Sequence, residues 1–522
     1  MLAARPLLQV PRGSRLRGLA GVLVGGLTIA VAIFFALTLA FDFEPSTAAP
    51  IAVLLGLTSE RFVELALNWK RDDLFAPTTL IASYFALDFA IRAIYLLKAT
   101  DPLRIGFVPY EDYIPTALWC ASLGYLAFTF GFRSQLAQGL VRKLPKALEW
   151  PQRLPFIRLT VLLLVGVACS AYLFSIGASV GTGSSLEFVY DPVPGTPVLL
   201  KSLVDMAWIA LCVALFRQER DPGRMAAWPL LICSVVAIGF DVVITGSKEA
   251  FLAPLIEAVI ILYYFRKLRV WHLLAVALPS LVLAFGVINA YRFIAVGKVG
   301  RAPKTFQDIV ELLSVTSDYF TSGSSKSDRS ALDQMLDRQE GVDALATIIK
   351  FTPEAHPYMF GRELLMLPVQ TFIPRSLWKD KPVENSSMEF EQDYLGAHYD
   401  YNGFTSIHLI ADCYRNFWYV GVACGMFLLG LFLRSVYLFC SPRGGAALGV
   451  FLYAYLVTNL THYMELFAFA LVGELIRQVL LLFAVCIFLG VHRKWHNDGI
   501  SSIVPLTNNG RRLDSFPASL SV

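Results

Sequence analysis

The sequence predicts an all-α polytopic membrane protein, and two observations support this class. Of its 522 residues, 56% are hydrophobic and only 16% are charged, and the mean hydropathy is +0.58. The apolar residues also form continuous runs close to the length of a membrane-spanning helix, about 20 residues. Such runs do not suit a barrel, whose strands alternate apolar and polar residues. Because lipid cannot satisfy backbone polar groups, the runs are expected to be helices.

Twelve apolar runs are predicted as spans. The second is the weakest, because Glu60, Arg61 and Glu64 interrupt it. The predicted spans cover residues 19–40, 50–67, 76–97, 113–132, 157–177, 198–217, 226–244, 250–265, 272–293, 405–433, 446–463 and 467–490.

The distribution of Lys and Arg predicts the orientation of these spans, because cytoplasmic loops retain positive charge. With the N-terminus inside, the outer connections at 41–50 and 177–195 contain neither residue. Both termini are therefore expected in the cytoplasm. The predicted parts of the chain are an N-terminal bundle of about nine spans (1–294), one large outer loop (295–404), the C-terminal transmembrane helices (405–490) and a cytoplasmic tail (491–522).

The large outer loop is expected to carry amphipathic helices. Within it, residues 329–350 read RSALDQMLDRQEGVDALATIIK, with apolar residues at a helical, one-sided spacing. This pattern predicts a helix that lies on the outer surface of the membrane.

The tenth predicted span carries the main candidate site. His408, Asp412 and Arg415 stand at i, i+4 and i+7, which places them on one helical face, and Asn416 follows. Ionisable side chains inside a membrane are costly unless they face a partner or a watery cavity. One interpretation is that Asp412 and Arg415 only neutralise each other. The other is a polar cavity in which His408 or Asp412 acts as a general base toward a hydroxyl.

A group of cations precedes this span. Arg375, Lys379 and Lys381 lie in IPRSLWKDKP, and Arg362 lies shortly before. They either meet lipid headgroups or form an anion site, for which Arg is suited by its two-pronged contact with phosphate.

Three further pairs of polar residues are expected at the outer ends of spans, at a similar depth: Lys248 and Glu249 in TGSKEAF, Tyr291 and Arg292, and His462 and Glu465. Asp88 and Arg92, at i and i+4 in the third span, are interpreted as a structural ion pair.

Other kinds of site are not indicated. The eight cysteines show no metal-type spacing, and there is no nucleotide-binding Gly-rich loop, HExxH or Gly-x-Ser-x-Gly motif. The net charge of +4 is spread along the loops, so a nucleic-acid partner is not expected. We therefore expect no cofactor and no metal.

Four motifs follow one another along the chain: TGSKEAFLAPL in a span, RSALDQM in the large loop, FIPRSLWKDKP, and an acidic residue that runs into NFWYVG. Their order resembles the O-antigen polymerase (Wzy-type) family of oligosaccharide repeat-unit polymerases. The resemblance covers residues 245–421, and PRSLWKDKP is its most specific part. Lys248 stands where the family pattern suggests Arg, and Asp412 where it often has Glu.

The resemblance implies a GT-C-like architecture in a bacterial inner membrane. It also implies transfer of a glycan from a polyprenyl diphosphate-linked oligosaccharide at the periplasmic face, with a flippase and a chain-length regulator of the same pathway as possible partners. By this resemblance, His408 or Asp412 would activate the acceptor. The set that would hold the diphosphate is Arg292, Lys248, Arg362, Arg375, Lys381 and Arg415, supported by Asn416, Tyr291, His462 and Glu465. A ligase that moves finished polymer from the same carrier and a twelve-span transporter are the alternatives.

Overall fold

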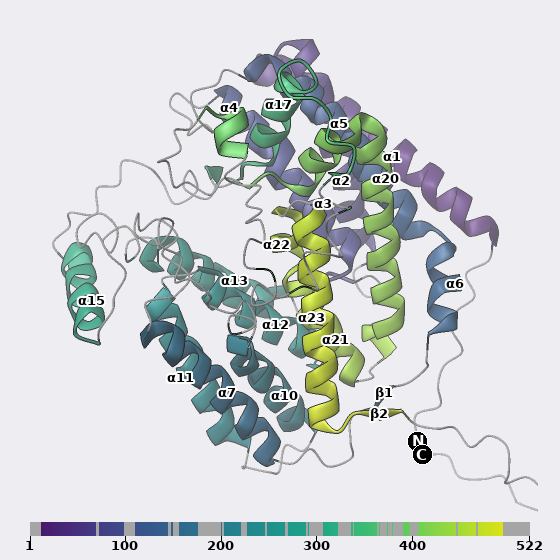
Figure 1. The fold of residues 1–522 in the computed structure, drawn as a ribbon. Coiled ribbons are helices and arrows are strands. Elements are labelled where there is room, and N and C mark those ends of the chain that lie inside the picture. Colours follow the sequence, from purple (N-terminus) through teal and green to yellow (C-terminus); the bar gives the residue numbers. More distant parts are fainter. Residues whose placement is uncertain are drawn as a thin grey trace, which may run out of the picture.

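The computed structural model is described with the element labels of Figure 1. The described residues are 12–68, 73–98, 110–144, 148–149, 156–175, 200, 203–220, 227–245, 248–266, 270–288, 291, 306–321, 336–337, 339–362, 365, 373, 378, 390–396, 406–444, 447–465 and 468–493.

Helices dominate the described part of the chain, which confirms the all-α class. The N-terminal helices are α1 (Arg12–Ala40), α2 (Pro45–Leu67), α3 (Pro77–Phe85), the π-helix η1 (Ala86–Ile91), α4 (Arg92–Lys98), η2 (Glu111–Tyr113), α5 (Ile114–Arg133), α6 (Leu136–Lys143) and α7 (Phe156–Ser175). The central helices are α10 (Met206–Arg220), α11 (Ala227–Thr245), α12 (Lys248–Arg266), α13 (Val270–Val282), the π-helix η3 (Leu283–Ile288), α15 (Phe306–Thr321), α17 (Gly341–Phe351) and the π-helix η5 (Phe390–Tyr394). The C-terminal helices are α20 (Leu409–Cys440), η6 (Pro442–Gly444), α21 (Ala447–Thr458), α22 (Leu460–Glu465) and α23 (Ala468–Leu489). The strands of the described residues, β1 (Leu148–Glu149) and β2 (His492–Arg493), form one short antiparallel pair.

The helices are those of a multi-pass membrane protein. Among the described residues, seven helices are long and apolar enough to cross a membrane: Leu23–Ala40, Pro77–Lys98, Glu111–Arg133, Phe156–Ser175, Trp228–Thr245, Leu409–Gly444 and Leu471–Leu489. Four shorter apolar helices add to these: Met206–Gln218, Ala250–Phe265, Trp271–Leu281 and Ala447–Thr458. The count of twelve spans stays a prediction.

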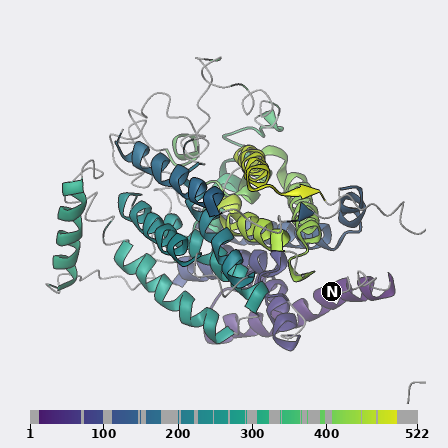
Figure 2. The ribbon, with the colours of Figure 1, turned by 90° about the horizontal axis from the view of Figure 1, so that it is seen from below.

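The helices form two groups, each with its own apolar core. The first core joins α2, α3, η1, α5, α17 and the beginning of α20. The second joins α7, α10, α11, α12, α21 and α23. In Figure 1, α2, α3, α5 and α17 lie in the upper part, α7, α10, α11 and α12 lie in the lower part, and α23 stands between α12 and the long helix α20. Figure 2, seen from below, shows α7, α10, α11 and α12 beside one another.

Asp73, between α2 and α3, ties the two groups together. Its Oδ2 atom accepts hydrogen bonds from the hydroxyls of Tyr264 on α12 (2.9 Å) and Tyr437 on α20 (2.7 Å). Arg443 Nε lies 3.3 Å from the same oxygen. The carboxylate is 1% exposed, so its charge is buried with these partners.

The position of α17 differs from the sequence prediction. The expected interfacial helix would expose one face, but every residue from Gly341 to Ile349 is buried. The helix packs against α5, η1 and α20 within the first core. The prediction of a surface-lying helix is therefore wrong for this part of the loop; its polar residue Asp343 has a partner inside the bundle, as described below.

The contact between α5 and α20 depends on glycine at two places. A Cβ atom at Gly131 would overlap the carbonyl oxygen of Phe427, and one at Gly430 would overlap that of Phe128. Small residues let membrane helices approach closely, which takes the place of a hydrophobic driving force within lipid.

We expect Gly430→Val to force α5 and α20 apart. The cost should be about 1–3 kcal/mol, as for an overpacked core, measured as a lower midpoint of thermal unfolding in detergent. The matched control is Gly239→Val on α11, where a Cβ atom meets nothing within 4 Å. Equal midpoints for the two variants would contradict this packing.

Candidate functional site

The predicted tenth span is broken and turns back on itself. Phe417 (φ −144°, ψ 29°) and Trp418 (φ 58°, ψ −150°) leave helical geometry inside α20. They separate an N-terminal arm (409–416) from a long arm (419–440). A Cβ at Gly421 would overlap the carbonyl oxygen of Cys413. Eight residues of one straight helix would separate these positions by about 12 Å, so the two arms lie against each other.

The loop before η5 caps the end of the N-terminal arm. The backbone N–H groups of Met359 and Phe360 donate to the carbonyls of Arg415 (3.2 Å) and Asn416 (3.1 Å). The N–H of Gly361 donates to Asn416 Oδ1 at 2.9 Å. These bonds satisfy carbonyls that a helix end leaves without partners. Gly361 has φ +72°, which glycine adopts without strain.

Asp412 is bonded through both carboxylate oxygens. Oδ1 accepts from Arg415 Nη2 (2.8 Å) and from Asn416 Nδ2 (3.2 Å), while Oδ2 accepts from the backbone N–H of Ala468 (2.9 Å). Asp412 and Arg415 are 1% and 2% exposed. This geometry favours a positioning role for Asp412, which holds Arg415 and the start of α23 against the arm.

His408, directly before the arm, hydrogen-bonds Tyr84 and lies close to Asp88, both in the third predicted span. Its Nδ1 atom lies 2.7 Å from the Tyr84 hydroxyl and 3.2 Å from Asp88 Oδ2. No described residue hydrogen-bonds Nε2. A carboxylate beside Nδ1 favours the tautomer with the proton on Nδ1, which leaves the Nε2 lone pair available to accept a proton. His408 also has φ 63°, a conformation that costs a non-glycine residue about 1–3 kcal/mol and clusters at functional sites.

Asp88 is set by two backbone features. It lies in the π-helix η1, and such segments often occur at functional sites. A Cβ at Gly341 would overlap Asp88 Oδ2, so the first residue of α17 closes over this carboxylate. The sequence interpretation of Asp88 and Arg92 as one ion pair missed that Asp88 faces His408.

Arg92 pairs with the buried loop segment. Its Nε and Nη2 atoms bond Asp343 Oδ2 (3.1 Å) and Oδ1 (3.3 Å), a two-pronged contact. Nη1 donates to the Leu336 carbonyl (3.1 Å) and to Asp337 Oδ1 (3.3 Å), and the Tyr110 hydroxyl donates to Asp343. These bonds compensate buried charges that would otherwise be costly.

The π-helix η5 lies against the end of α17. Tyr394 bonds Thr352 (3.1 Å between the hydroxyl oxygens), and its ring centroid is 4.6 Å from that of His356. Burial raises the pKa of the Tyr394 hydroxyl, and the charge of Arg415 opposes this. Tyr394 is thus a neutral hydroxyl that shares a hydrogen bond with Thr352, in which either hydroxyl can donate.

An exposed aromatic group surrounds the break in α20. Phe360, Phe417 and Trp418 are exposed, and the Phe360 and Phe417 ring centroids are 6.2 Å apart. The exposed Arg362 follows directly after Gly361. Aromatic and cationic side chains together are typical of a membrane–water interface.

The remaining predicted site residues that the structure describes lie with the second helix group or in α22. Lys248 is buried at the start of α12, and the Tyr291 hydroxyl donates to the Val243 carbonyl of α11, so both lie with helices of the second group. The Glu465 side chain is exposed, but the Glu465 carbonyl accepts a bond from Ser406. His462 lies in α22, and its side chain is outside the described set. Arg292, Arg375 and Lys381 also lie outside the described residues.

Sequence reasoning missed Tyr84, Asp88 and Asp343 as members of this site. Their bonds span 324 residues for Tyr84 and His408 and 233 for Tyr110 and Asp343, far beyond any local pattern. Within the described ranges, no three His, Cys, Asp or Glu side chains come together as a metal site.

Fold and site together define an all-α multi-pass membrane protein with a buried polar centre built on a broken helix. The chain belongs to the family described as Domain of unknown function (DUF8712), which matches residues 170–458, more than half of its length. That region includes His408, Asp412 and Arg415 but not Tyr84 or Asp88. No curated protein and no solved structure matches the chain.

Arg92→Met should destabilise the protein strongly. It leaves the buried Asp343 and Asp337 carboxylates without their cation, at an expected cost of about 3–5 kcal/mol in unfolding free energy. The double variant Arg92→Met with Asp343→Leu should recover part of that loss. Thermal unfolding in detergent measures both.

The control for this prediction is Arg477→Met. Arg477 pairs with Glu474 on α23, and its side chain is 41% exposed, so the change should cost only about 0–1 kcal/mol. If Arg92→Met behaved like Arg477→Met, the buried pair would not anchor α17.

Proposed function

We propose that this protein is a glycosyltransferase of the bacterial inner membrane that polymerises lipid-linked oligosaccharide repeat units into surface polysaccharide. The donor is a growing glycan on polyprenyl diphosphate, and the acceptor is a hydroxyl at the non-reducing end of a new repeat unit. The observation that supports this most is the imidazole of His408, whose Nδ1 lies close to Asp88 and Tyr84 while no described residue hydrogen-bonds Nε2.

His408 is the base in this proposal. Nε2 accepts the proton of the acceptor hydroxyl as its oxygen bonds to the anomeric carbon of the donor sugar. Asp88 stabilises the resulting imidazolium, as a carboxylate does when it orients a catalytic histidine. Asp412, whose oxygens are all engaged, is assigned to positioning instead of proton transfer.

The cations stabilise the leaving group. The bond between the anomeric carbon and the diphosphate oxygen breaks, and negative charge develops on the diphosphate. Preorganised cations facing such charge supply a large share of catalysis in many enzymes. Arg362, exposed beside the arm, and Arg415, fixed by Asp412, are assigned to it. Arg375, Arg292, Lys381 and Lys248 complete the proposed set.

The proposed orientation places the break in α20 at the periplasmic side. Arg434 and Arg443 lie toward the other end of the long arm, and cytoplasmic ends retain such cations. The long arm has 22 residues, enough for about 33 Å at 1.5 Å per residue. The aromatic group at Trp418 then lies at the outer interface, with both chain termini in the cytoplasm.

Two alternatives remain beside the polymerase. A ligase that transfers finished polymer from the same carrier would use the same base and cations. A transporter is favoured by one specific observation, the broken helix α20, because transporters often bind their substrates at discontinuous helices.

Replacement of His408 should abolish glycan transfer. His408→Gly removes the imidazole and also accepts the positive φ angle without strain. The rate of transfer between purified lipid-linked repeat units in proteoliposomes should fall about 100-fold or more, the scale of general-base catalysis. His272→Ala, at an exposed histidine of α13, is the matched control. A His408→Gly enzyme within about twofold of wild type would remove His408 from this role.

The arginine series tests the diphosphate site. Arg362→Ala, Arg375→Ala and Arg415→Ala should each shorten the polymer, because less charge stabilises the leaving diphosphate. Arg362→Lys should recover only part of the loss, since an ammonium lacks the two-pronged guanidinium contact with phosphate. Polymer length on a gel is the readout, and normal length in Arg375→Ala and Arg415→Ala would show that the assignment is wrong.

A further inference from the structure

A buried carboxyl group lies in the apolar core of the second helix group. Glu257 stands on the face of α12 that points into this core, in line with Ala253, Ile260 and Ile261, and it is 1% exposed. It is nine residues from each end of α12, which is about 14 Å. Because α12 is a predicted span, this carboxyl lies at the depth of the bilayer.

Few groups compensate this carboxyl. The Cys212 thiol on α10 hydrogen-bonds it, and the charged group that interacts with it is Asp205, directly before α10. The Oε1 atom of Glu257 has no hydrogen-bond partner in the described part of the chain. Most buried polar atoms in proteins are hydrogen-bonded, so an orphaned oxygen marks a place where a ligand can bind.

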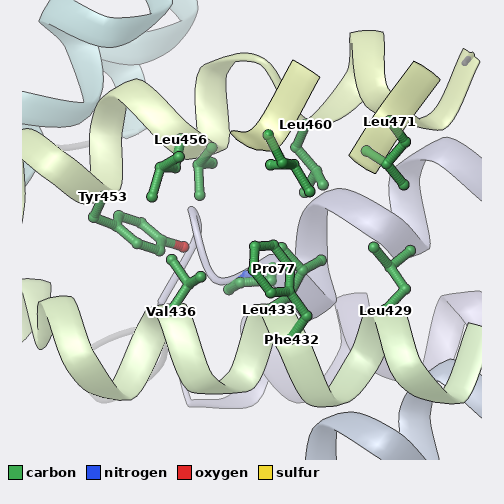
Figure 3. Close-up of a pocket in the computed structure, with 11 residues that line it drawn as sticks. Pro77, Leu429, Phe432, Leu433, Val436, Tyr453, Leu456, Leu460 and Leu471 are labelled. Carbon is green, nitrogen blue, oxygen red and sulfur yellow. The ribbon is translucent and has the colours of Figure 1, made fainter. Parts of the chain in front are cut away.

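The other elements that pack against α12 are α11, α21 and η3, and their titratable groups have other partners. Asp241 on α11 bonds a serine on α7 (2.9 Å). On α21, the Tyr455 hydroxyl donates to Asp205 Oδ2 (3.3 Å) and the Tyr453 hydroxyl donates to a backbone carbonyl before α3. Figure 3 shows Tyr453 on the side of α21 that faces α20. The η3 sequence, LAFGVI, contains no titratable side chain.

A proton is the ligand that suits this setting. An ionised carboxyl in an apolar core is costly without a cation, whereas the protonated form is neutral. A hard metal ion such as Ca²⁺ takes about six to eight oxygen ligands. The described groups that interact with Glu257 are one thiol and one second carboxyl, which do not form such a shell.

We propose that Glu257 is an intramembrane proton-binding site, which protons reach by way of Asp205. Asp205 is half-buried and stands seven residues before Cys212, about 10 Å along α10, so it lies between Glu257 and the end of the helix group. In each exchange an O–H bond of protonated Asp205 breaks and one forms at Glu257 Oε1; release runs in reverse. Ionisable side chains inside membrane bundles often form such proton relays. This role is separate from glycan transfer at His408.

The test is infrared difference spectroscopy of the full-length protein in nanodiscs, between neutral and alkaline buffer. The spectrum should contain the carbonyl stretch of a neutral carboxylic acid, which is lost at alkaline pH and returns at neutral pH. Glu257→Gln keeps the shape of the side chain but cannot titrate, so it should remove this band. The matched control is Glu354→Gln, at an exposed glutamate after α17, which should retain it. If Glu257→Gln does not fold, Glu257→Asp should shift the band instead of removing it.

The route through Asp205 has its own readout. In heavy water Glu257 exchanges its proton for a deuteron, which shifts the band. Asp205→Asn should slow this exchange about 100-fold, the scale of a positioned proton-transfer group. The asparagine oxygen can still accept the bond from Tyr455, so the local structure is retained.

Four results would overturn this proposal. A spectrum that Glu257→Gln leaves unchanged would show that Glu257 holds no proton. A band that neither titrates nor exchanges in heavy water would make Glu257 a structural acid. Loss of the band on addition of Na⁺ at constant pH would assign the site to a metal ion. Equal exchange in wild type and Asp205→Asn would remove Asp205 from the route.

Discussion

The buried contact between Arg92 and Asp343 is the constraint on which the site depends. An arginine inside a membrane helix needs a partner, and Arg92 finds two carboxylates on a segment 244 to 251 residues further along the chain. This pairing draws α17 into the first core. Gly341 then lies against Asp88, and Asp88 in turn contacts His408. The pairing of Arg92 with Asp343 thus positions α17, and α17 in turn positions Asp88 beside the proposed base, His408.

The second polar pair has a different role. The Asp412 carboxylate holds the Arg415 guanidinium within one turn and also fixes the start of α23. At the break at Phe417 and Trp418, the loop at 359–361 donates hydrogen bonds to the freed carbonyls of Arg415 and Asn416 and to the Asn416 side chain. Arm, loop and third span therefore form one unit, although they come from distant parts of the sequence.

Hydropathy predicted the class of fold, and residue spacing drew attention to the polar residues of one helix. The runs at 76–97 and 113–132 correspond to the helices Pro77–Lys98 and Glu111–Arg133, and the spacing of His408, Asp412 and Arg415 predicted a helix there but not its break. The break of α20 was missed because its residues include neither Pro nor Gly; the signal lay in Gly421 and Gly425, which make room for Cys413. The one-sided periodicity of 329–350 is compatible with a helix on the membrane surface and with a helix packed in the bundle. The buried helix α17 has Asp343 among its apolar residues, where it pairs with Arg92.

The surface glycan profile of cells that lack the gene is the decisive test of the proposed glycan polymerisation. Read beside their polyprenyl-linked intermediates, this profile should show single repeat units on the surface acceptor in place of a ladder of lengths. Polymer stranded on the lipid carrier would identify a ligase. An unchanged profile would contradict the proposed polymerase and favour a transporter.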